Sequence, residues 1–121
     1  MLIGDYCAAS ALIAFGAVLG KCSLFQMFGI ASVHVFFYAL NKNIIEVVFK
    51  ASDHGGSIII HLFGATFGLV ASFFYQRKAA LADKHAMDQG NYLSDLTSIV
   101  GTLFLFCYWP SFNAATLVGG F

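Results

Sequence analysis

The sequence predicts an all-α membrane protein whose 121 residues cross the bilayer in four helices. Composition is the first reason: 60% of the residues are hydrophobic, only 10% are charged and the mean hydropathy is +0.81, whereas about a quarter of the residues in soluble domains are charged. The second reason is length, because four apolar runs reach or approach the roughly 20 residues that span a bilayer. These runs lack the alternating pattern of barrel strands, so helices are expected.

The four expected spans are separated by polar segments. They cover residues 3–20, 22–41, 55–76 and 96–121, and the last three contain no Asp, Glu, Lys or Arg. The first run carries Asp5 near its start and has no basic leader before it. We therefore interpret it as a span and not as a cleaved signal peptide.

Basic residues predict the orientation of the chain, because cytoplasmic loops are enriched in them. The first and third loops hold more of these residues than the second: Lys21, Arg77, Lys78 and Lys84, against Lys42 and Lys50. We expect the first and third loops to be cytoplasmic and the region around Asp53 to face outside.

Net charge and cysteine usage argue against several other classes of protein. The formal net charge is zero and the sequence shows no basic patch, so no nucleic-acid partner is expected. The cysteines are odd in number and widely spaced, which predicts neither a disulfide framework nor a zinc site: Cys7, Cys22 and Cys107. We interpret them as small apolar filler and expect no metal and no cofactor.

Small residues recur four positions apart in two of the spans. Gly16 and Gly20 form such a pair in the first span, and Gly64 and Gly68 form one in the third. In lipid, this spacing lets helix backbones approach closely. We expect these glycines at helix-packing contacts.

Two features of the last third of the chain predict local structure. Pro110 lies inside the fourth span and leaves the carbonyl of Phe106 without its helical donor. A kink beside a cavity and a simple packing kink both fit this pattern. Ser94 or Asp95 is expected to cap the fourth helix, and helix formers in the third loop allow a short surface helix.

His61 is the residue that most strongly suggests chemistry. It lies about 12 Å along a helix from Asp53, and at spacings of three and seven from Gly64 and Gly68 it is expected to face what those glycines approach. An ionisable group within a membrane marks by default a path for an ion, proton or polar solute. The alternative is a core histidine hydrogen-bonded to backbone, and for His34 that alternative is favoured.

Asp53 has two compatible interpretations. It can cap the third helix and stabilise the positive end of the helix dipole, with Gly55 and Gly56 allowing backbone amides to come close. It can also contact a cation directly. A capping carboxylate beside a vestibule still contributes negative potential.

Three stretches of the sequence carry a family resemblance. DYCAASALIAFGAVLGK, DHGGSIIIHLFGATFGL and GTLFLFCYWPSFNAA resemble the ammonium transporter and Rhesus glycoprotein superfamily, and the Rhesus branch in particular. The resemblance runs from Asp5 to about Thr116, with the motifs in the family's order. It implies a homotrimeric plasma-membrane channel, not an enzyme, in which each subunit takes up ammonium at an outer vestibule. Conduction would proceed as ammonia or by a proton-coupled route.

The resemblance also implies roles for individual residues. His61 would be the first of two pore histidines, and Asp53 would support the outer site. Tyr6 and Phe112 would be stacked gate aromatics. Further residues would line or buttress the pore: Trp109, Asn113 and Thr116. Neutral ammonia loses only a few hydrogen bonds in an apolar pore, and an imidazole can partly replace them.

Three departures from the family pattern stand out. Family members carry eleven or twelve spans, so residues 1–121 are expected to form one partial transmembrane domain, a fragment carrying the outer gate and the first pore histidine. Tyr6 places a hydroxyl at an apolar gate position. Lys42 lies where many relatives have an acid, and it would weaken cation recruitment if it pointed inward, or else snorkel to the interface. The alternatives are a truncated, non-conducting scaffold or assembly subunit, and an unrelated four-span protein.

Overall fold

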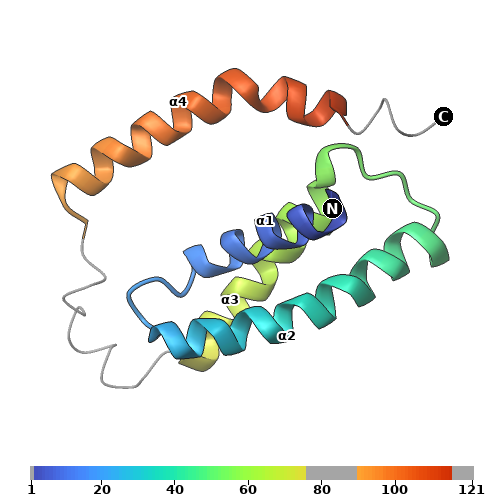
Figure 1. Cartoon of the computed structure of the whole chain (residues 1–121), viewed down its shortest axis with the longest axis horizontal. Helices are drawn as coiled ribbons and strands as arrows, with labels where there is room; N and C mark the ends of the chain where they lie inside the picture. Colours follow the sequence, from blue (N-terminus) through green and yellow to red (C-terminus); the bar gives the residue numbers. More distant parts are fainter. Residues whose placement is uncertain (1, 76–89, 116–121) are drawn as a thin grey trace.

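A computed structural model of the chain describes residues 2–75 and 90–115, and Figure 1 shows their arrangement. Every regular element in these two ranges is helical, which confirms the predicted all-α class. Three helices are long and apolar enough to cross a membrane: Leu24–Val48, His54–Tyr75 and Tyr92–Ala115. The chain is a multi-pass membrane protein.

Helix α1 (Leu2–Gly16) is shorter than the expected first span. Its 15 residues extend about 22 Å at 1.5 Å per residue, less than the roughly 30 Å of bilayer hydrocarbon. Residues 17–20 form turns, and Gly20 has a φ of 76°. Glycine adopts that left-handed conformation without steric cost, so Gly20 suits the turn. The apolar run of the sequence therefore extends four residues beyond the end of the helix.

Helix α2 (Leu24–Asn43) begins at a capping box. The Ser23 hydroxyl accepts a hydrogen bond from the Gln26 amide at 3.3 Å, and the Ser23 amide donates to the Gln26 side chain at 2.8 Å. Two amide donors at the start of the helix are thereby satisfied. The cap fixes where the chain re-enters the membrane after α1.

Helix α2 continues beyond the predicted end of the second span at residue 41. It passes into the π-helical turn η1 (Ile44–Val48), and Lys42 and Glu46 form an ion pair one turn apart across this junction. Such pairs support helical structure. The polar residues that suggested a loop therefore remain helical, and the chain turns only near Lys50, whose φ is 50°.

The third span starts within one residue of the predicted position, but it is not regular there. Its predicted end at residue 76 lies outside the described residues. It consists of the 3₁₀ turn η2 (His54–Gly56), the π-helical turn η3 (Ser57–Leu62) and helix α3 (Phe63–Tyr75). Gly55 and Gly56 have φ values of 74° and 67°, which favour glycine. The irregular entry determines where the side chains of this span point.

Helix α4 (Tyr92–Ala115) starts one turn earlier than expected. Its first amides are capped by Asn91, whose side-chain oxygen accepts from the Ser94 amide at 2.9 Å. The prediction of Ser94 or Asp95 as cap was wrong, because asparagine is an equally good cap. Residues 116–121, and the third-loop segment 76–89 where a surface helix was expected, lie outside the described residues.

Pro110 lies within α4, in the part of the helix that approaches Ala115. The Ser111 hydroxyl donates to the carbonyl of Tyr108 at 2.8 Å, so a side chain takes part in the hydrogen bonding of this turn. Trp109 and Phe112 flank the proline and both contact residues of the third span. The proline therefore lies at the contact between α4 and the third span.

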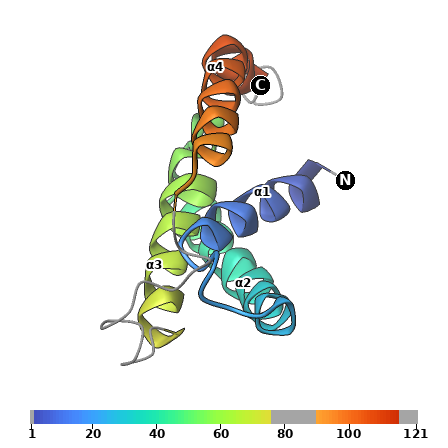
Figure 2. The ribbon, with the colours of Figure 1, turned by 90° about the vertical axis from the view of Figure 1, so that its left-hand side faces the viewer.

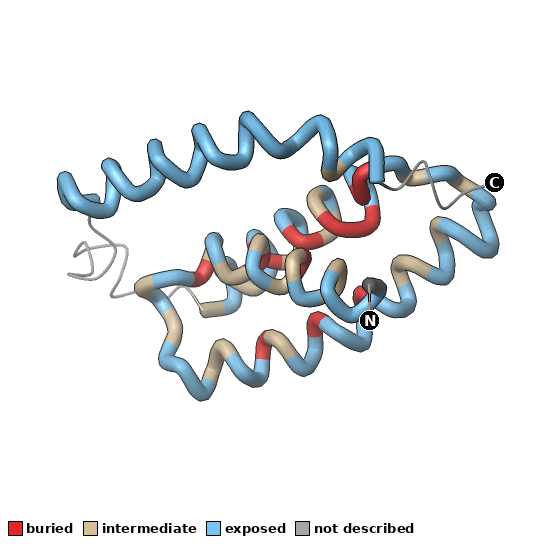
Figure 3. Tube along the Cα trace, turned by 45° about the horizontal axis from the view of Figure 1, so that its top comes forward, coloured by how far each residue is buried: buried red, intermediate tan, exposed pale blue. Residues whose placement is uncertain are grey.

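Helices α1, α2 and α3 pack against one another, whereas α4 contacts the start of the third span. In Figure 1, α1 and α3 lie between α2 and α4, and Figure 2 shows α1 and α2 on one side of α3. Figure 3 shows burial concentrated where α1 and the third span meet, while α4 is exposed along almost all of its length. The start of α1, the end of α2, the start of the third span and the end of α4 share one end of the molecule.

Helices α1 and α3 are in direct backbone contact through glycine. A Cβ atom on Gly64 would lie 2.6 Å from the carbonyl oxygen of Ser10, and one on Gly68 would lie 2.6 Å from that of Ala14. Gly16, by contrast, would have nothing within 4 Å of a Cβ. The glycines of the third span therefore find their partner within this chain.

Candidate functional site

A cavity of about 530 Å³ opens at the end where these helix termini gather, and we call it the mouth. Its lining comes from α1, α2, η1, residues 51–53, η2, η3 and α4, and includes these polar and aromatic residues: Tyr6, Tyr38, Lys42, Glu46, Ser52, Asp53, His54 and Phe112. Segments that are far apart in the sequence therefore converge on one concave surface, as ligand sites generally require.

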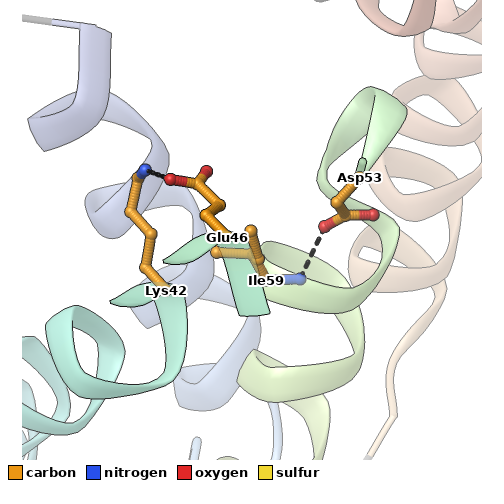
Figure 4. A network of polar contacts seen from close by, with 4 residues as sticks. All are labelled: Lys42, Glu46, Asp53 and Ile59. Atoms are coloured by element: carbon orange, nitrogen blue, oxygen red, sulfur yellow. Dashed lines mark hydrogen bonds and ion pairs between the residues drawn. The ribbon is translucent and has the colours of Figure 1, made fainter. Parts of the chain in front are cut away.

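Asp53 caps the helical structure that leads inward from the mouth. Its two carboxylate oxygens accept from the Ile58 amide at 3.1 and 3.0 Å, and one of them accepts from the Ile59 amide at 2.8 Å. Figure 4 shows the bond to Ile59. The positive φ values of Gly55 and Gly56 let the chain turn back so that the carboxylate reaches these amides. A negative charge at this position is favoured by the helix dipole.

The Lys42–Glu46 ion pair lines the mouth beside Asp53 (Figure 4). Lys42 does point inward, but Glu46 compensates its charge. Asp53, whose hydrogen-bond donors are backbone amides, gives the mouth a net negative charge when His54 is neutral. The pair is partly exposed and adds little stability, so its main effect is on the local potential.

Aromatic rings form the floor of the mouth. Tyr6 and Phe112 meet edge to face, with centroids 6.3 Å apart and an interplanar angle of 72°. Phe112 stacks instead on Trp109, at 5.3 Å and 23°. The resemblance implied two stacked gate rings, and the structure replaces that stack with a perpendicular pair, a geometry that the ring quadrupoles favour.

His61 lies below this floor. Its ring is 5.0 Å from that of Trp109 and 6.2 Å from that of Phe112. Its Nε2 atom is buried and has no hydrogen-bond partner among the described residues. A buried nitrogen without a partner is costly.

The expected shared face of His61 with Gly64 and Gly68 is not observed. The glycines contact α1, whereas the histidine ring contacts α4. The reason is the π-helical turn that contains His61, because its i→i+5 bonding shifts the register relative to the regular helix that follows. A spacing argument based on 3.6 residues per turn does not hold across such a turn.

Another predicted pore-lining residue, Asn113, lies in α4. Asn113 packs on Gly55, where any Cβ would overlap the side-chain oxygen of Asn113, so it connects α4 to the rim of the mouth. Thr116 lies outside the described residues. Together with Trp109 and Phe112, Asn113 fixes the end of α4 on the third span.

Sequence reasoning missed Ser10, which meets His34 in the core of the bundle. Both are fully buried, and the Ser10 oxygen lies 3.1 Å from His34 Nε2 and 3.0 Å from the Ile60 carbonyl oxygen. His34 is a core histidine, as favoured, although its partner is a side chain. Serine occurs often in membrane helices, so its presence in the first span did not indicate a contact with His34.

Comparison with known proteins identifies the family of this chain. Residues 1–120 match the Ammonium Transporter Family. The chain is 45% identical over 116 residues to the ammonium transporter Rh type A of Rattus norvegicus, covering 95% of this chain and 25% of the rat protein. It is 44% identical over 115 residues to the ammonium transporter Rh type B of Pongo pygmaeus, covering 95% and 24%.

These matches cover nearly all of the chain but only part of each relative. The ammonium transporter Rh type B of Danio rerio gives the same proportions, at 43% identity over 115 residues, with 95% of this chain and 25% of the fish protein covered. The chain thus spans about a quarter of the length of the curated relatives it matches. The family match extends through the mouth, its aromatic floor and His61, and the chain belongs to the ammonium transporter family.

Proposed function

We propose that this chain forms the outer part of an ammonia-conducting path of the Rh type in the plasma membrane. The observation that carries the proposal is the buried, unpartnered Nε2 of His61 directly below the Tyr6–Phe112 floor of a negatively charged mouth. Such a mouth attracts cations in general, and ammonium is one that can give its proton to water in the mouth and continue as neutral ammonia.

The path works by selective desolvation. The field of Asp53 raises the local concentration of cations in the mouth. The aromatic floor rejects hydrated ions, because stripping water from a charge in an apolar passage is far more costly than stripping it from ammonia. Below the floor, the His61 imidazole offers ammonia a hydrogen-bond partner. Each of these steps uses residues that lie at one end of the molecule.

The chain acts as part of a larger Rh-type channel in this proposal. It spans about a quarter of the length of its relatives, and α4 exposes almost all of its length. Exposed residues along α4 fit contacts with further helices of such a channel, and three copies would each hold one path. The competing function is a non-conducting scaffold or assembly subunit in which His61 and Asp53 serve only packing.

Replacing His61 with leucine is expected to reduce transport by about tenfold, the equivalent of one lost hydrogen bond of about 1.4 kcal/mol. The measurement is methylammonium uptake in a host lacking ammonium transporters. The tested protein is the rat Rh type A relative carrying this chain in place of its matched segment, alongside the chain by itself.

Thr66→Val is the control for His61→Leu, because it also replaces a polar side chain of the third span with an apolar one. Thr66 is exposed, its hydroxyl donates to the Leu62 carbonyl of its own span, and it does not line the mouth. The control substitution is expected to leave uptake unchanged. Uptake that is equal in the His61→Leu and unsubstituted chimaeras, or a chimaera that is inserted but silent, would favour the scaffold function.

Lys42→Gln is expected to lower the apparent KM for methylammonium by about twofold at low ionic strength, without changing the maximal rate. The substitution releases Glu46 from its ion pair, and one uncompensated charge at ~10 Å in water has an effect of this size. Lys50→Gln removes the same charge from a residue that does not line the mouth. An equal response of the two variants, or a response that persists in high salt, would argue against a local field effect.

A further inference from the structure

The buried contact between Ser10 and His34 has a defined direction. The Ser10 hydroxyl donates to the Ile60 carbonyl oxygen at 3.0 Å, and its oxygen lies 3.1 Å from His34 Nε2. A carbonyl can only accept, so the single hydroxyl proton is committed to Ile60. The serine oxygen must then accept from His34, which carries its proton on Nε2. The bonds run from His34 on α2 through Ser10 on α1 to the third span.

The remainder of the His34 ring makes apolar contacts. Phe63 and Phe67 lie 5.3 and 5.0 Å away, and Tyr38 stacks on the ring at 6.0 Å. The Nδ1 atom is buried and has no hydrogen-bond partner within the described ranges. An unsatisfied buried nitrogen costs free energy. The hydrogen bond from His34 to Ser10, which in turn donates to Ile60, offsets part of that cost.

Ile60 directly precedes His61 within the π-helical turn Ser57–Leu62. Such turns interrupt the regular helical ladder and are frequent at functional sites. At the end of this turn the Phe63 amide is shared between the carbonyls of Ile58 and Ile60. The Ser10 hydroxyl is therefore an additional donor, from another helix, to the irregular turn that aims His61.

Gly64 makes this approach possible. A Cβ at this position would lie 2.6 Å from the Ser10 carbonyl oxygen and 3.0 Å from the Ser10 hydroxyl oxygen. The bare backbone of Gly64 thus lets Ser10 reach the carbonyl of Ile60 one turn earlier. The glycine contact and the polar contact fix the same stretch of the third span from the side opposite α4.

We propose that Ser10 and His34 are positioning residues that hold the π-helical turn so that the His61 ring points at Trp109 and the floor of the mouth. Their importance for transport rests on the function proposed above for His61. Their effect on the direction of the His61 ring can be measured independently of transport.

Trp109 provides the readout, because it is the only tryptophan in the sequence and its ring lies 5.0 Å from that of His61. An imidazole ring in contact with an indole quenches its fluorescence. The chain in lipid nanodiscs is expected to show weaker Trp109 emission than its His61→Leu variant, and this difference in emission is the quenching step. Ser10→Ala and His34→Leu are expected to remove most of this step although both leave His61 and Trp109 in place.

Conservative variants and matched controls separate positioning from general damage. Ser10→Thr keeps the hydroxyl and His34→Gln keeps an N–H donor, so both are expected to retain the step. Ser32→Ala removes a serine on α2 whose hydroxyl bonds only within its own helix, to the Phe28 carbonyl, and should change nothing. Ser10→Cys, nearly identical in shape but a weak donor, should lose part of the step with full helicity by circular dichroism.

The proposal is overturned if Ser10→Cys and His34→Leu keep the full quenching step, or if the unsubstituted chain shows no step that depends on His61. If Ser10→Ala does not fold, Ser10→Cys decides the matter. A reduced step in Ser10→Cys together with unchanged uptake in His61→Leu would leave the positioning role standing and remove the proposed function.

Discussion

Gly68→Ala is expected to destabilise the chain by about 3 kcal/mol, the upper part of the range for overpacking a well-packed contact. The added Cβ would lie 2.6 Å from the carbonyl oxygen of Ala14 and 2.8 Å from its Cα. Both atoms belong to the backbone of α1, so no side chain can rotate away. In lipid there is little hydrophobic drive between helices, and separating α1 from α3 removes the packing that joins them.

Gly16→Ala is the control for this substitution. It makes the same chemical change on α1, where a Cβ would meet nothing within 4 Å, and alanine is preferred over glycine in helices by about 1 kcal/mol. Unfolding in mixed micelles with increasing dodecyl sulfate, followed by circular dichroism, should shift in opposite directions for the two variants. Equal shifts would contradict the close packing of α1 on α3.

Asp53→Ala is expected to cost about 2 kcal/mol of folding free energy, as for loss of a strong helix cap. The substitution leaves the amides of Ile58 and Ile59 without the carboxylate that accepts from both. It also removes a negative charge from the positive end of the helix dipole. Unfolding in mixed micelles with increasing dodecyl sulfate measures the loss. We expect the turn at Gly55 and Gly56 to lose its defined conformation first.

Asp53→Asn separates capping from charge, because the amide keeps one oxygen acceptor. We expect a smaller loss of stability than with alanine, and a higher KM for methylammonium in the chimaera. Asp5→Asn is the matched charge control, since Asp5 is exposed on the first turn of α1 and does not line the mouth. If both Asp53 variants lose as little folding free energy as Asp5→Asn, the cap contributes nothing to stability.

The helices could be predicted from the sequence where composition and length decide. The start of the third span was located to within one residue because Asp53, two glycines and an uninterrupted apolar run define it. The predicted ends of the first two spans were wrong because hydropathy does not register backbone conformation. Helix α1 ends at Gly16 although apolar residues continue to Gly20, and the Lys42–Glu46 ion pair lies within a helix that polar residues were expected to end.

The candidate site could be predicted only in part. The resemblance named Tyr6, Asp53, His61 and Phe112, and the structure gathers all four at one end of the bundle. The π-helical turn could not be predicted, because it has no periodic signature. The contacts of Ser10 with His34 and Ile60 join residues 24 and 50 positions apart, and no local pattern reports on such a distance.

Lys21, the lysine that follows α1, joins two elements of the bundle. Its ammonium group donates to the carbonyl of Ala17 at 3.3 Å and to the hydroxyl of Ser72 on α3 at 3.1 Å. The backbone contacts at Gly64 and Gly68 hold the same two helices further along their length. Because α1 and α3 are held both along their length and at the end opposite the mouth, we expect them to move as one rigid unit and not to hinge apart.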